Sequence, residues 1–385
     1  MEEHKGGTSF GAIVATIGAV LIALGIAWLI ALNWSSIPDA LKIVILIILT
    51  GGSYIAGTMM KIKDYKGIGG SLQVLGGLLY TLSIFLIAQI FSTDASMQGI
   101  AILLLLAWAG VLASAYIFDS SPSLIIALVE FLIWIGVQFI AFFEHTRGDP
   151  SIGIIALVYL FTGVLLFGLT QLHKSKDHKF ANVYRYWTAF YMLLLTYILS
   201  FQVLLPALWP SEATTSAGAL IFIIIFAIVS IIIAGIGISM AVAKGKISAN
   251  EILAAIGVVA VYGLLITLAT LVSESRYGLF GGGISGGLFL LWIFDNILFI
   301  GVILAVIGYG VKNRSSKIVN LGIIFFTIDI ITRYIGFIMD FGGQIGFAVV
   351  AIFGGVILIF GGWGIERWRK KLMTEVKAPT GHIYT

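Results

Sequence analysis

The chain contains no cysteine, which excludes a disulfide framework, a thiol nucleophile and a cysteine metal site. Histidine is also scarce, and all five histidines lie in connections or tails between the apolar segments. An intramembrane serine protease needs a histidine within a membrane helix, and the H-E-x-x-H motif of a metalloprotease is missing. The sequence therefore offers no catalytic residue and no metal site, and we expect neither enzyme activity nor a cofactor.

Charge is sparse as well. Only 10% of the 385 residues are charged and 60% are hydrophobic, whereas a soluble domain has about 25% and about 45–50%. The formal net charge is only +4. No connection between the apolar runs is long enough to form a soluble catalytic or nucleic-acid-binding domain. We therefore expect a partner in the lipid bilayer and none in nucleic acid.

The apolar residues fall into continuous runs of roughly 20, the length that a helix needs to cross about 30 Å of hydrocarbon. Helices are required because the bilayer core offers the backbone no hydrogen-bond partner. The runs predict an all-α integral membrane protein, a polytopic bundle of about 12 transmembrane helices. The predicted spans are 10–32, 41–60, 68–91, 98–118, 123–144, 151–171, 186–206, 217–241, 251–272, 286–308, 318–338 and 344–364.

The basic residues alternate between the two sides of these spans. If the N-terminus is cytoplasmic, 18 of the 22 lysines and arginines lie in cytoplasmic segments. Only Lys42, Arg147 and Arg276 lie on the opposite side, and Arg333 lies within a span. Such a bias is typical of the positive-inside rule. It predicts a multi-pass protein of the plasma (cytoplasmic, or inner) membrane with the N-terminus and the C-terminus in the cytoplasm.

The domain organisation follows from the same pattern. Residues 1–366 are predicted to form a single transmembrane helical domain. Residues 367–385 are predicted to form a short, basic cytoplasmic tail, disordered beyond Trp368. A stop-transfer function is the main interpretation of its basic cluster, and contact with anionic lipid is the other.

Several short motifs occur in the first part of the chain. They are Leu32–Pro38 (LNWSSIP), Tyr54–Gly57 (YIAG), Gly76-Gly77, Ile84–Phe91 (IFLIAQIF) and Trp108. This series resembles the predicted membrane protein family called domain of unknown function 2157, over about residues 10–145. The segment from Asp329 to Arg367 resembles the end of longer members. Many relatives differ in having a soluble segment before the first span and a tyrosine at the position of Phe91. The resemblance implies a prokaryotic multi-spanning protein and implies no activity.

Four ionisable side chains lie deep within predicted spans: Glu130, Asp295, Asp329 and Arg333. A charge at the centre of a membrane helix costs about 2.5–3.5 kcal/mol on insertion scales, so each needs a partner or a function. Asp329 and Arg333 are four residues apart and therefore face the same way on one helix. A satisfied structural ion pair is the main interpretation of these two residues.

Glu130 and Asp295 have no remaining basic partner within the spans, because Arg333 can neutralise only one acid. They are expected to be protonated, cation-bound or hydrated. One interpretation is an exchangeable carboxyl of a coupled transporter, and the other is a protonated acid that hydrogen-bonds a neighbouring helix. Gln89 is a further polar candidate, although a glutamine in a span more often holds helices together.

Two classes of function remain open, with a third behind them. The leading hypothesis is a transporter- or permease-like protein for a small solute, with coupling to a proton or a cation as one option. Its polar pathway would include Glu130, Asp295, Asp329, Arg333 and Gln89. The alternative is a non-transporting scaffold or partner subunit for a cell-envelope process. An intramembrane enzyme ranks third.

Overall fold

The computed structural model describes residues 10–33, 36–91, 96–144, 152–201, 217–272, 286–340 and 344–377. The described residues form twelve helices, which confirms the predicted all-α class. Eleven of the twelve begin within two residues of their predicted starts. The chain divides into two compact units, Met1–Arg147 with Ser216–Ala219, and Gly148–Thr215 with Leu220–Thr385. The single transmembrane domain expected over residues 1–366 stays a prediction.

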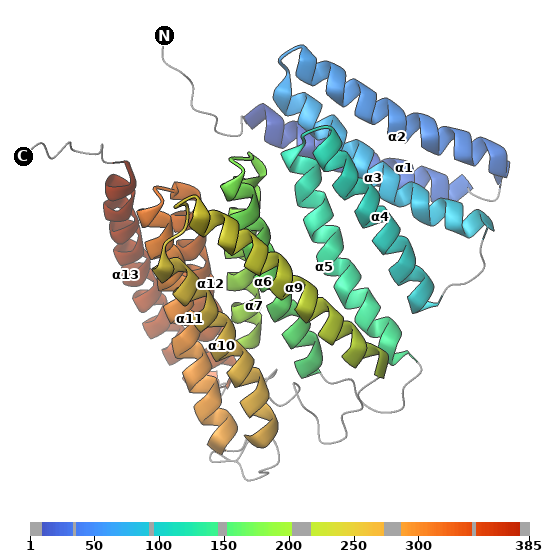
Figure 1. Ribbon diagram of the computed structural model, residues 1–385. Coiled ribbons are helices and arrows are strands. Elements are labelled where there is room, and N and C mark those ends of the chain that lie inside the picture. Colours follow the sequence, from blue (N-terminus) through green and yellow to red (C-terminus); the bar gives the residue numbers. More distant parts are fainter. Residues whose placement is uncertain are drawn as a thin grey trace, which may run out of the picture. The chain divides into compact units, whose positions relative to one another are not determined.

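Unit 1 contains five helices (Figure 1). They are α1 (Phe10–Asn33), α2 (Asp39–Ile62), α3 (Lys66–Phe91), α4 (Met97–Ile117) and α5 (Ser121–Phe143). Helix α3 is central, because it packs against α1, α2, α4 and α5. Two serines fix the starts of α4 and α5: the Ser96 hydroxyl accepts a hydrogen bond from the Gly99 amide, and the Ser120 hydroxyl accepts one from the Ser123 amide.

Unit 2 contains the other seven helices, apart from the first residues of α9. They are α6 (Ile152–Ser175), α7 (Phe180–Leu199), α9 (Ala217–Ala243), α10 (Ala249–Val272), α11 (Gly286–Lys312), α12 (Ser316–Asp340) and α13 (Gln344–Lys377). Helix α7 packs against α6, α11 and α12, and α10 packs against α6 and α11. These contacts bring the deep polar residues of α7, α10, α11 and α12 into one region.

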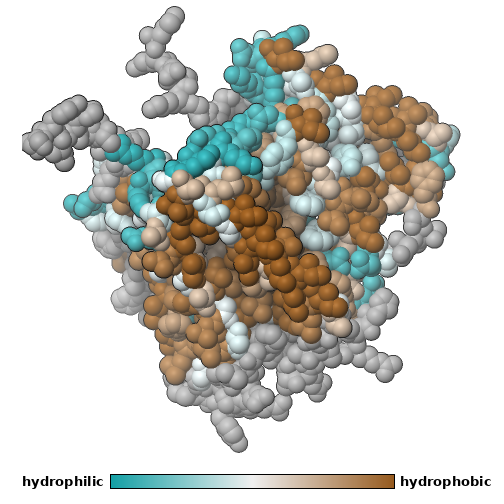
Figure 2. Space-filling model, in the orientation of Figure 1, coloured by the Kyte–Doolittle hydropathy of each residue, from teal (hydrophilic) through white to brown (hydrophobic). Residues whose placement is uncertain are grey.

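Nine of the helices within the described ranges, α2–α6 and α9–α12, are long and apolar enough to cross a membrane. Their outer faces are apolar too: on α9 the side chains of Ile221, Ile224 and Ile232 are each more than half exposed. Figure 2 shows hydrophobic residues along α9 and α10 on the visible face of unit 2. Exposure of such a continuous apolar surface to water is unfavourable, so these helices would contact the lipid bilayer. The count of twelve spans and the orientation of the termini stay predictions.

The connections that were predicted to share one side of the membrane meet at one end of unit 2. Lys246, after α9, forms an ion pair of 2.5 Å with Asp177, after α6. Lys312, at the end of α11, forms one of 3.2 Å with Glu251 at the start of α10. Lys246 holds the pKa of the Asp177 carboxyl below its usual range, through a hydrogen bond and its positive charge. Within this unit, successive helices therefore run in opposite directions, as the alternation of basic residues between the two sides of the spans requires.

Two predicted boundaries differ from the structure. Helix α7 begins at Phe180, before the predicted span start at residue 186, and Arg185 lies on this helix with its side chain lining a pocket. The predicted end of this span at residue 206 lies outside the described residues. Helix α13 continues to Lys377, so the disorder predicted after Trp368 is wrong for that stretch. An ion pair between Arg369 and Glu366, one helical turn apart, supports the continued helix.

Helices α6 and α9 approach each other closely at glycines. A Cβ atom at Gly168 would lie 2.5 Å from the Cα atom of Ala234, and one at Gly237 would collide with the carbonyl oxygen of Gly168. Small residues permit this kind of backbone approach between membrane helices.

Gly237→Ala is therefore expected to lower the thermal unfolding midpoint of the purified protein. The added methyl group would force the α6 and α9 backbones apart, at a cost of about 1–3 kcal/mol. Gly235→Ala is the matched control, because a Cβ at Gly235 meets nothing within 4 Å. Equal midpoints for the two variants would contradict the close crossing.

Candidate functional site

Three of the deep charged residues lie together in unit 2, where α7, α11 and α12 pack against one another. Asp295 lies on α11, and Asp329 and Arg333 lie one turn apart on α12. Helix α7 ends beside them at Leu199, and Ser200 follows as its C-terminal cap. The site thus combines two acids and one base with the exposed carbonyl groups of a helix end.

Arg333 connects α12 to the end of α7. Its Nε donates a hydrogen bond of 3.1 Å to Asp329 Oδ1, which confirms the pair predicted from the four-residue spacing. A terminal guanidinium nitrogen donates to the Ser200 hydroxyl. The guanidinium carbon also lies 4.7 Å from the ring centroid of Phe201, a cation–π distance. Arg333 therefore already has an acid, a hydroxyl and an aromatic ring as partners.

Asp295 is in a different situation. Its side chain is 0% exposed, and neither carboxylate oxygen has a hydrogen-bond partner within the described part of the chain. Two groups nevertheless interact with it: Arg333 through its charge, and the Tyr262 hydroxyl of α10 through a contact of hydrogen-bond type. The Tyr262 hydroxyl is also buried without a hydrogen bond of good geometry. A buried carboxylate left in this state is costly, so Asp295 is expected to carry a proton or to bind a cation.

The surrounding polar groups fix the end of α7. The carbonyl oxygen of Ser200 accepts hydrogen bonds from Trp292 Nε1 (3.1 Å) and Asn296 Nδ2 (3.4 Å), both on α11. The Tyr197 hydroxyl donates to Thr332 Oγ1 on α12 at 3.1 Å. The sequence reasoning missed Ser200, Tyr197 and Trp292, because nothing in the chain indicated that α7 would end against α11 and α12.

The other two predicted site residues belong to unit 1. Glu130 on α5 is only 6% exposed, and its Oε1 accepts a hydrogen bond from the Thr81 hydroxyl of α3. Its Oε2 has no partner among the described residues. Gln89 is exposed on α3. The five predicted residues therefore divide between the units: three come together in unit 2, whereas Glu130 lies in a helix contact of unit 1 and Gln89 lies on its surface.

Unit 1 also contains a buried amide side chain. Gln73 on α3 is 0% exposed, and neither side-chain amide atom has a hydrogen-bond partner within the described ranges. It lies beside Gly57 of α2, at a close crossing of α2 and α3. Within the described ranges, no three His, Cys, Asp or Glu side chains come together to hold a metal ion.

Comparison with known proteins gives one family match, over the first third of the chain. No curated protein and no solved structure matches the chain. A family model described as "Predicted membrane protein (DUF2157)" matches residues 1–124. This match confirms the resemblance inferred from the motifs between Leu32 and Trp108, and the chain is similar over that range to a family of membrane proteins.

Proposed function

We propose that the protein is a membrane transporter for a small solute, in which Asp295 exchanges a proton or a cation during the transport cycle. The observation that carries the proposal is the state of this carboxyl: it is fully buried, and among the described residues its only hydrogen-bonding neighbour is the Tyr262 hydroxyl, in a contact that leaves neither oxygen with a well-formed hydrogen bond. A purely structural acid in a membrane helix is expected to bind a neighbouring helix through at least one of its oxygens. Asp295 instead has no well-formed hydrogen bond among the described residues beyond its contact with Tyr262, so its oxygens can take an exchangeable ligand.

The neighbouring charges support the same proposal. Arg333 is close enough to interact with Asp295 but is hydrogen-bonded to Asp329 and Ser200. Arg333 carries one positive charge and interacts with two acids, so it can neutralise only one of them. Protonation or cation binding at Asp295 would allow Arg333 to remain with Asp329, and loss of the proton or cation would attract Arg333 to Asp295. Such a change in pairing is a physical means to couple a proton or cation to a movement of α12.

A test measures proton and sodium flux in liposomes that contain the purified full chain, with an imposed membrane potential and a panel of small solutes. The wild-type protein is expected to give flux above that of protein-free liposomes, and Asp295→Asn is expected to abolish it. Asp64→Asn is the matched control, because this acid is exposed in the connection between α2 and α3. Glu130→Gln shows whether the second buried acid contributes.

Two results would contradict the proposal. One is a wild-type protein with no flux under any of these conditions. The other is a flux that remains unchanged in Asp295→Asn, since the exchangeable carboxyl would then be elsewhere or absent.

A further inference from the structure

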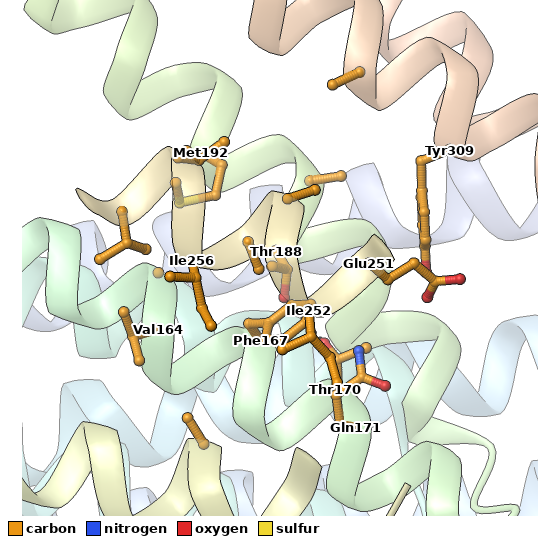
Figure 3. Close-up of a pocket in the computed structure, with 18 of the residues that line it drawn as sticks. Val164, Phe167, Thr170, Gln171, Thr188, Met192, Glu251, Ile252, Ile256 and Tyr309 are labelled. Carbon is orange, nitrogen blue, oxygen red and sulfur yellow. Dashed lines mark hydrogen bonds between the residues drawn. The ribbon is translucent and has the colours of Figure 1, made fainter. Parts of the chain in front are cut away.

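A pocket of about 710 Å³ lies within unit 2, among α6, α7, α9, α10 and α11. Its walls are mainly apolar, with Phe161, Val164 and Phe167 from α6, Met192 from α7 and Ile256 from α10. Figure 3 shows several of these side chains directed into the same space. The volume lies in the usual range of small-molecule sites, about 300–1,000 Å³. None of the residues of the proposed transport site lines this pocket.

One end of the pocket is polar. Gln171 of α6 is only 1% exposed, and its Oε1 has no hydrogen-bond partner in the described part of the chain. The Nε of Arg185, from the first turns of α7, is also buried without one. Tyr309 of α11 interacts with Arg185 and with Glu251 of α10 (Figure 3 shows Tyr309 and Glu251 on the same side). Oε2 of Glu251 is a third buried atom without a hydrogen bond among the described residues. Buried polar atoms normally have partners, so these three atoms indicate that a ligand group belongs here.

The charges at this end are mostly positive. Glu251 is the acid at the pocket, and Lys174 (4.0 Å) and Lys312 (3.2 Å) both pair with it. Arg185 adds a third basic group, so the pocket end has an excess of positive charge. Lys244 and Lys246 extend this basic region towards the α6–α7 connection, where they donate to the carbonyl oxygens of Ser175 and Lys174.

The basic end also lies at the level where lipid headgroups are expected. It coincides with the end of unit 2 at which the α6–α7, α9–α10 and α11–α12 connections meet. Figure 2 shows hydrophilic residues gathered at this end and hydrophobic residues along the helices that extend from it. The pocket therefore has an apolar part at the depth of acyl chains and a basic part at the interface.

We propose that this pocket binds an anionic phospholipid. An acyl chain would occupy the apolar part between α6, α7 and α10. The phosphate group would lie against Arg185 and Lys312, and Gln171 Oε1 would accept a hydrogen bond from a headgroup hydroxyl. Charge complementarity selects an anionic headgroup over a zwitterionic one, because the basic groups at this end outnumber Glu251 and Asp177.

The inference does not rest on transport, so its test is a binding measurement on the purified full chain in detergent. Phosphatidylglycerol and phosphatidylcholine with identical acyl chains are compared by native mass spectrometry. Phosphatidylglycerol is expected to bind more tightly, and inorganic phosphate is expected not to displace it. Each basic group near the headgroup contributes about 1 kcal/mol, or about fivefold in affinity.

Three variants define the site. Arg185→Gln is expected to weaken phosphatidylglycerol binding about fivefold and phosphatidylcholine binding by less, because the choline cation is repelled by the guanidinium that its phosphate contacts. Ala255→Phe, which fills the apolar part, is expected to weaken the binding of both lipids. Lys66→Gln is the matched control, because Lys66 is exposed in unit 1 and pairs only loosely with Asp64 at 3.4 Å. A folded Arg185→Gln variant has the elution profile of the wild type in size-exclusion chromatography.

The proposal would be overturned by equal affinity for the two lipids, or by an Arg185→Gln variant that folds and retains the full preference. A third result would also overturn it. The purified wild-type chain would be a dimer that dissociates when lipid binds, and Ala255→Phe would dissociate in the same way. In that case a second copy, not a lipid, would occupy the apolar surface.

Discussion

Replacement of Arg333 by methionine is expected to lower the stability of unit 2 by about 3 kcal/mol, near the lower end of the range for removing one partner of a buried ion pair. The Arg333 and Asp329 side chains are only 26% and 9% exposed. Methionine would leave the Asp329 carboxylate buried without its guanidinium. It would also remove the hydrogen bond to Ser200 that connects α12 to the end of α7. The measurement is the thermal unfolding midpoint in detergent.

Two further variants separate charge from packing. Asp329→Asn in the Arg333→Met background is expected to recover part of the loss, because no unpaired charge would remain at Asp329. Arg369→Met is the matched control, since the Arg369–Glu366 pair has side-chain exposures of 43% and 48%, and an exposed pair contributes about 0–1 kcal/mol. Equal losses for Arg333→Met and Arg369→Met would show that the pair on α12 is not a buried one.

Single-cysteine labelling is expected to give an all-or-none result for the membrane orientation. The wild-type chain has no cysteine, so each introduced cysteine is the only thiol. Ser36→Cys and Lys63→Cys lie at opposite ends of α2. Glu144→Cys lies at the end of α5, before α6 in the chain, and Lys176→Cys lies directly after α6. All four positions are exposed. An impermeant maleimide added to intact cells is expected to label Ser36→Cys and Glu144→Cys only.

The physical reason is the charge bias: the lysine-rich segments are expected to stay in the cytoplasm, with Lys63 and Lys176 among them. In inside-out vesicles the labelling pattern is expected to reverse. Labelling of both ends of α2, or of both positions that flank α6, from the same side would contradict the alternation. A reversed pattern in intact cells would retain the spans and place both termini outside the cytoplasm.

The helices could be predicted from the sequence because a membrane span has a nearly fixed length and composition. Length and composition alone predicted a span over 217–241, and the structure has α9 there, Ala217–Ala243. Boundaries failed where a polar residue lies on a helix. Arg185 was placed before the span because a charge is costly in lipid, but its side chain lines a pocket whose walls come from five helices. Such a pocket has no signature in any one segment.

Part of the candidate site could be predicted from the sequence, and part could not. The Asp329–Arg333 pair follows from local helix geometry, because residues four apart share a face. The approach of Asp295 to this pair depends on how α11 packs against α12, which the spacing of residues does not determine. Glu130 had the same features in the sequence as Asp295, yet it lies in unit 1 with a threonine as hydrogen-bond donor. Burial of an acid is thus visible in the sequence, and so is a partner four residues away, whereas its partners on other helices are not.

Carbodiimide labelling tests the central claim, an exchangeable Asp295, most directly. A hydrophobic carbodiimide reacts with a protonated carboxyl group in an apolar environment, and peptide mass spectrometry identifies the modified residue. Asp295 is expected to be modified at neutral pH, less so in sodium or as the pH is raised, while Asp329 stays unmodified beside Arg333. An inert Asp295, with Asp329 modified or with neither acid modified at any pH, would contradict the claim.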